Sequence, residues 1–102
     1  MTRVAIVGGG PAGLSAALFA AKNGLEAVVF DTDGTWMHKA HLFNYPGVGS
    51  LDGSAFMKTA RQQADDFGAE RHQDAEVTDV ESTDDGFAVT AEGDEHEADY
   101  LV

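Results

Sequence analysis

The first thirty residues alternate between short apolar runs and a helical pattern of apolar positions. The run from Arg3 to Val7 has the character of a buried strand, and so does a second run, Ala27 to Phe30. Between them, apolar residues recur at the three- and four-residue spacing of a helix: Leu14, Ala17, Leu18 and Ala21. Gly24 follows as the expected helix end. These features predict a strand-helix-strand (βαβ) unit.

A second helix and several short strands are expected later in the chain. Ser54 to Phe67 is predicted to be helical because apolar residues share one face: Phe56, Ala60, Ala64 and Phe67. Asp52 or Ser54 is expected to cap its start, and Gly68 to end it. Short strands are expected over residues 69–72, 75–82, 87–92 and 95–102, with glycine-containing turns before the last two. The predicted fold is α/β, a Rossmann-like βαβ unit with a three-strand β-meander.

A loop of about twenty residues, Thr32 to Gly53, separates the βαβ unit from the second helix. It is rich in glycine but also contains large apolar residues: Trp36, Met37, Leu42, Phe43, Tyr45 and Val48. Such side chains are costly to leave in water. The loop could cover the core or fold over a flat ligand. The two interpretations are compatible, and its place after a βα unit favours the ligand.

The turn between the first strand and the helix contains three glycines in G-x-G-x-x-G spacing, Gly8, Gly10 and Gly13. The first permits the tight turn, the second lets a pyrophosphate approach the backbone, and the third lets the helix pack closely on the strand. Pro11 suits the first helical turn. Asp31 ends the second strand about where the ribose-binding acid of such sites is expected. Together these features predict a dinucleotide-binding site.

The charge is distributed unevenly. Up to position 64 there are five basic and four acidic residues, whereas the remainder has one basic and fourteen acidic residues, which gives a net charge of −12 overall. This balance argues against a nucleic-acid partner, because phosphate binding requires the opposite sign. Excess acid also suits a salt-adapted (halophilic) protein, since salt screens the self-repulsion.

The chain has no cysteine, which excludes disulfides, thiolate metal sites and thiol redox chemistry within it. No apolar run approaches membrane-spanning length and no signal peptide is evident, so a soluble cytoplasmic protein without a membrane partner is expected. His38 and His41 lack a well-spaced third ligand, so no metal site is predicted.

Over essentially all of its 102 residues, the chain resembles the N-terminal part of the FAD domain of thioredoxin reductase and related pyridine nucleotide-disulfide flavoproteins. The resemblance rests on the glycine turn, the acid that ends the second strand, the segment Asn44-Tyr-Pro-Gly47, and the meander that ends in Ala98 to Val102. It implies FAD as the cofactor. The implied FAD-binding residues are Gly8, Gly10, Pro11, Ala12 and Gly13 at the pyrophosphate, Asp31 at the ribose, Asn44 near the flavin ring and Val77 at the adenine.

Three departures from that family limit what the resemblance implies. Its glutathione reductase branch has a redox cysteine pair soon after the second strand, where this chain has the cysteine-free segment Asp33 to Ala40. The thioredoxin reductase branch carries its cysteines in an NADPH domain, which residues 1–102 do not include. An Ala-Thr-Gly turn is expected after Val102. The chain is therefore expected to be the N-terminal part of one FAD-binding domain, cut short. It would form the FAD-binding portion, itself without redox cysteines, of an FAD-dependent oxidoreductase.

Two other functions stay open at this point. The chain could be a non-catalytic, truncated nucleotide-binding module whose sheet is completed by a partner chain or a second copy. It could instead be an NAD-binding Rossmann domain, because Asp31 has no arginine after it. In the loop, Lys39 lies either beside the flavin or in solvent, and Trp36 either stacks on the flavin or packs. The groups that would face a redox substrate or electron donor lie outside these residues.

Overall fold

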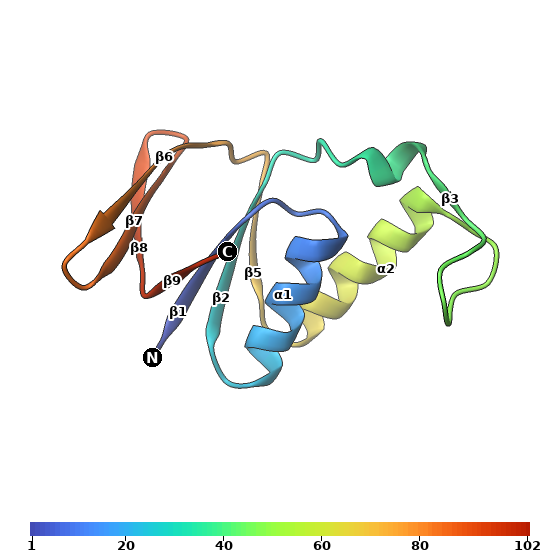
Figure 1. The fold of residues 1–102 in the computed structure, drawn as a ribbon, viewed down its shortest axis with the longest axis horizontal. Helices are drawn as coiled ribbons and strands as arrows, with labels where there is room; N and C mark the ends of the chain where they lie inside the picture. The colour runs from blue at the N-terminus through green and yellow to red at the C-terminus, as the bar shows by residue number, and fades with distance from the viewer.

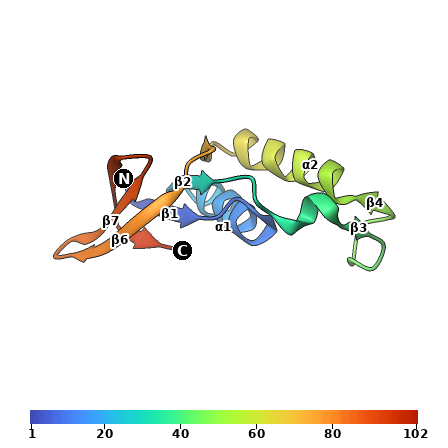
Figure 2. The same ribbon diagram turned by 90° about the horizontal axis from the view of Figure 1, so that it is seen from above.

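The computed structural model describes all residues, Met1–Val102, as three layers (Figure 1, Figure 2). A parallel sheet forms the middle layer, with two helices against one face and an antiparallel meander against the other. The elements in chain order are β1 (Arg3–Val7), α1 (Pro11–Lys22), β2 (Glu26–Asp31), the 3₁₀ helix η1 (Trp36–Lys39), β3 (His41–Leu42), β4 (Leu51–Asp52), α2 (Gly53–Asp66), β5 (Glu70–Gln73), β6 (Val77–Thr83), β7 (Gly86–Ala91), β8 (Asp94–Ala98) and β9 (Tyr100–Leu101). No helix is long and apolar enough to cross a membrane.

The central sheet confirms the predicted βαβ unit. Its strand order is β5-β2-β1-β9, and every pairing is parallel. In β1 and β2 successive side chains point to opposite faces, and both faces are covered, so that both strands read as continuous apolar runs. Because β1 and β2 are parallel, their carboxyl ends lie at the same edge of the sheet, and the glycine turn leaves β1 at this edge.

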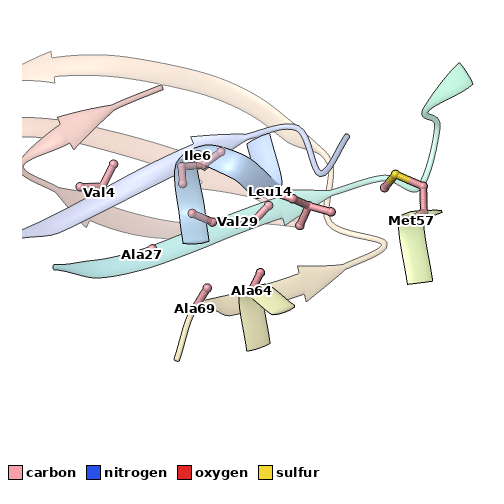
Figure 3. Close-up of a cluster of buried hydrophobic side chains, with 9 residues drawn as sticks. Val4, Ile6, Leu14, Ala27, Val29, Met57, Ala64 and Ala69 are labelled. Atoms are coloured by element: carbon pink, nitrogen blue, oxygen red, sulfur yellow. The ribbon is translucent and has the colours of Figure 1, made fainter. Parts of the chain in front are cut away.

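The two faces of the sheet have separate apolar cores. Towards the helices, Val4 and Ile6 of β1 and Val29 of β2 pack with Leu14 of α1 (Figure 3). Towards the meander, Val28 and Phe30 of β2 pack with Ala5 and with residues of β7 and β8. Phe30 is among the largest fully buried side chains, and its ring lies 4.9 Å from that of His96 on β8. Full burial of such a side chain stabilises the fold by about 2–3 kcal/mol.

The second helix differs in detail from the prediction. It ends at Asp66, so Phe67 is a capping residue and is half exposed rather than part of the apolar face. Met57 takes a core position instead, four residues after the buried Gly53. Asp52 occupies the N-cap position, but its side chain makes no capping hydrogen bond. The hydroxyl of Ser54 contacts the ring of His38.

The meander β6-β7-β8 is confirmed, but its last predicted strand is two strands. The chain leaves the meander at Asp99, whose carboxylate accepts a hydrogen bond from the Arg3 backbone N–H at 2.8 Å. β9 then joins the parallel sheet beside β1. The turn before β8 falls one residue earlier than expected, on Glu92 and Gly93, which both have positive φ. Such a pair matches the right-handed twist of a hairpin.

Candidate dinucleotide-binding site

The glycine turn is built directly onto the sheet edge. The N–H of Gly8 donates to the carbonyl of Phe30 at 2.9 Å, and Gly8 has a φ of +110°, which L side chains rarely adopt. Gly13 faces back onto this turn, and a Cβ placed there would lie 1.8 Å from the Gly8 carbonyl oxygen. The close helix–strand packing expected of the third glycine is therefore present in the structure.

The start of α1 is open to a ligand. Gly10 is its N-cap residue and Pro11 its first residue, and neither a capping side chain nor an acidic residue occupies the first turn. The first N–H groups of a helix have no intrahelical partner, and they carry the positive end of its dipole. A Cβ at Gly8 would meet nothing within 4 Å, and one at Gly10 only the Thr35 side chain, at 3.4 Å. These residues, with Ala12 and Gly13 at the first N–H groups, fit a pyrophosphate.

Asp31 lies beside this turn and is nearly buried, with 4% of its side chain exposed. Its Oδ1 accepts the Asp33 N–H at 2.7 Å, and its Oδ2 lies 3.3 Å from Nη2 of Arg61. A Cβ at Gly9 would stand 2.2 Å from the Asp31 Cγ. Gly9 therefore makes room for the carboxylate, a role that its position between two motif glycines did not predict.

Asp33, with a φ of +60°, joins Asp31 to a polar network. Its carboxylate binds Arg61 of α2 and also lies 2.7 Å from Nε2 of His38. The hydrogen bond from Arg61, and then the one from His38, hold the pKa of Asp33 below its ordinary value. The other ring nitrogen of His38 lies 3.3 Å from the hydroxyl of Ser54 at the start of α2. The network ties the end of β2 to α2.

Sequence reasoning missed Thr35 and Arg61. Thr35 lies beside Gly10 and caps η1 through its hydroxyl, which accepts the Met37 N–H at 3.2 Å. The dinucleotide-binding motif names the three glycines and the ribose-binding acid, and it includes no residue at the position of Thr35. Arg61 reaches Asp31 across thirty positions of sequence. Its only available signal was that it is one of two basic residues in the second helix.

Val77 follows the segment that connects β5 to β6, and this segment passes the end of β2. The Ala75 N–H donates to the Asp31 carbonyl at 2.9 Å, so the chain between β5 and β6 crosses the carboxyl end of β2. Val77 opens β6 two residues later and packs against the meander-side core. Val77 therefore follows two residues after the position that is hydrogen-bonded to Asp31.

Asn44 is exposed in the loop that joins β3 to β4. The neighbouring Tyr45 packs on Phe56 of α2, with 6.1 Å between ring centroids. Tyr45 also lines, with Pro11, a hollow of about 290 Å³ between α1 and α2. The loop therefore approaches the start of α1 through Tyr45, and the structure shows no direct contact of Asn44 with the glycine turn.

The large apolar side chains of this loop do not form the packed cover that was one of the two expectations. Trp36 is 79% exposed and Phe43 75% exposed, and only Leu42 is buried. Met37 packs at the margin of the helix-side core. The Lys39 ammonium lies 5.1 Å from the centroid of the Trp36 ring, within range of a cation–π contact. Trp36 therefore does not pack against the core, and its ring is exposed beside Lys39.

The parallel sheet, the glycine turn at its carboxyl edge and the open helix start define a dinucleotide-binding α/β protein. A family model described as pyridine nucleotide-disulphide oxidoreductase matches residues 2–102. The chain belongs to this family.

The individual relatives are thioredoxin reductases. The chain is 36% identical over 105 residues to that of Streptomyces clavuligerus, covering 97% of this chain and 32% of that protein. It is 35% identical over 88 residues to that of Spironucleus barkhanus, covering 83% of this chain and 28% of that protein. The chain thus spans about a third of the length of the relatives it matches.

Solved structures that are similar to this chain are also thioredoxin reductases. The T. acidophilum thioredoxin reductase superposes with a TM-score of 0.89 at 31% identity, over 99% of this chain and 34% of that one. The atypical thioredoxin reductase TRi from Desulfovibrio vulgaris Hildenborough gives 0.88 at 32% identity, with the same two coverages. The resemblance and the fold class predicted from the sequence are confirmed.

Proposed function

We propose that this chain binds FAD and forms the flavin-binding part of a thioredoxin reductase-like, FAD-dependent oxidoreductase. The observation that carries the proposal is the uncapped, acid-free start of α1, which follows Gly8, where an added Cβ would meet nothing within 4 Å. A helix start without a partner at the carboxyl edge of a parallel sheet is suited to an anionic dinucleotide. Family membership supports FAD as that dinucleotide.

Each part of the site has a distinct role in this proposal. The backbone from Gly8 to Gly13, including Pro11 and Ala12, holds the pyrophosphate. The Asp31 carboxylate accepts the ribose hydroxyls, the Val77 backbone contacts the adenine, and Asn44 lies near the flavin ring. When bound, FAD supplies the electron-transfer chemistry, and the protein supplies binding and orientation.

The redox partner is also part of the proposal. The chain has no cysteine, so its own residues provide no dithiol for a flavin to reduce or oxidise. We propose that the flavin exchanges electrons with a small redox substrate or an electron donor that is bound by groups beyond these residues.

FAD titration of the purified chain tests the cofactor assignment. Added FAD is expected to bind at least about tenfold more tightly than NADH, with the flavin fluorescence changing as the complex forms. Calorimetry of both ligands in the same buffer provides the comparison. Tighter binding of NADH would support the NAD-binding alternative, and binding of neither would contradict the dinucleotide site itself.

We also propose that the protein is adapted to high salt. Support comes from the meander, where β6 is exposed at every residue after Val77 and includes Asp79 and Glu81. The thermal midpoint is expected to rise by roughly 10 °C between low salt and about 1 M KCl, where the Debye length falls to about 3 Å. The double variant Asp79→Asn, Glu81→Gln should show a smaller rise. A midpoint independent of KCl would contradict the proposal.

A further inference from the structure

The helix α2 brings a guanidinium group to the end of β2. Nη2 of Arg61 lies 3.3 Å from Oδ2 of Asp31 and also pairs with Oδ1 of Asp33. The Arg61 side chain is only 19% exposed, and its Nε is buried without a hydrogen-bond partner. A buried N–H without a hydrogen-bond partner is unfavourable. The two carboxylate contacts therefore determine the position of the Arg61 side chain, although its Nε is left without a partner.

Asp31 needs such a partner because its carboxylate is nearly buried. An ionised carboxylate taken out of water is costly unless it is paired and hydrogen-bonded. Asp33 supplies a backbone N–H, but it also adds a second negative charge beside the first. Arg61 is the cation that contacts both, so it offsets their repulsion and fixes the direction of the Asp31 carboxylate.

Hydrogen bonds within the chain do not use every acceptor position of the Asp31 carboxylate. A carboxylate offers about four acceptor positions, and the Asp33 N–H and Arg61 occupy one on each oxygen. The remaining positions can accept the two hydroxyls of a ribose. Two carboxylates against one guanidinium also leave a net negative charge, which disfavours a ribose that carries a phosphate.

We propose that Arg61 is a positioning residue for ribose recognition, an inference that rests on the proposed FAD function. It does not touch the nucleotide in this scheme. It holds Asp31 in the one orientation that accepts the hydroxyls of an unmodified adenosine ribose, and Asp33 holds Arg61 in turn.

The test compares FAD with the analogue whose adenosine is 2′-deoxy, using the full 102-residue chain. The wild type is expected to prefer FAD by about tenfold or more, because a hydrogen bond to a charged group is lost with the hydroxyl. In Arg61→Met the preference should fall to about twofold. Lys58→Met, which removes an exposed cation from the same helix, should keep the wild-type preference. The affinity ratio is the readout, because a general loosening of the fold would weaken both ligands alike.

The outcomes separate this inference from the proposed function. If the wild type binds neither ligand, the FAD assignment fails. If the wild type prefers FAD and folded Arg61→Met keeps that preference, only the role of Arg61 is overturned. A wild type that binds both ligands equally overturns the ribose contact, and the inference with it.

A second variant covers the case in which Arg61→Met does not fold. Asp33→Asn keeps the Asp33 N–H to Asp31 and removes the charge of the carboxylate that pairs with Arg61 and with His38. Its side chain is 41% exposed, so the substitution is compatible with folding. The preference for FAD is expected to fall by about threefold, and an unchanged preference would overturn the inference.

Discussion

Replacing Gly13 with alanine is expected to destabilise the domain by about 3 kcal/mol or more. The new Cβ would stand 1.8 Å from the Gly8 carbonyl oxygen, which is backbone and has no rotamer to change. Gly8 cannot easily move, because its N–H is bonded to Phe30 in the buried strand β2. Either α1 tilts off the sheet or the turn opens, and both uncover the helix-side core. Thermal unfolding should show a fall in the midpoint of about 12–24 °C.

Gly10→Ala is the matched comparison, because it changes the same turn without a backbone clash. A Cβ at Gly10 meets only the Thr35 side chain, at 3.4 Å, and Gly10 has an ordinary negative φ. Its thermal midpoint is therefore expected to stay near the wild-type value while FAD binding weakens by about tenfold or more, since the methyl group stands where a pyrophosphate approaches. A Gly13→Ala protein as stable as wild type would contradict the packing argument. Unchanged FAD binding by Gly10→Ala would contradict the assigned phosphate contact.

This pair shows why the glycine motif was readable from the sequence. Each of its glycines meets a local geometric demand within one turn, so the spacing alone carries the information. The strands β1, β2 and β7 were predictable for the same reason, since their apolar patterns and the turn residues beside them place each strand to within one residue. Local patterns were sufficient wherever the structure depends on residues close in sequence.

The missed features depend on contacts between distant residues. Arg61 meets Asp31 only because the tertiary fold brings α2 to the end of β2, and no local pattern in the helix marks that residue. The final strand divides at Asp99, whose carboxylate accepts a hydrogen bond from the backbone N–H of Arg3, 96 positions away. Trp36 was given two alternatives, stacking on the flavin or packing, because hydrophobicity predicts a partner without saying which one, and its exposure disfavours packing. Tertiary contacts, rather than propensity, decided each of these cases.

The loop between β2 and α2 is fixed by a contact of the same kind, and its disruption is the second large effect expected. A Cβ at Gly53 would lie 1.7 Å from the Met37 carbonyl oxygen and 2.9 Å from that of Ala40. Gly53→Ala should therefore force η1 away from the start of α2 and cost about 3 kcal/mol, comparable to Gly13→Ala. Trp36, the single tryptophan, lies on η1 and reports the displacement through its fluorescence.

Gly49→Ala provides the control for this loop, because a Cβ there meets nothing within 4 Å and no left-handed φ is required. It should leave both the thermal midpoint and the Trp36 emission unchanged, within about 0.5 kcal/mol of stability. The two variants therefore distinguish the contact between η1 and the start of α2 from a general effect of replacing a glycine in this loop. Because η1 begins beside Thr35, which contacts the Gly10 position, Gly53→Ala should also weaken FAD binding. A stable Gly53→Ala protein with wild-type emission and wild-type FAD affinity would show that η1 does not position the glycine turn.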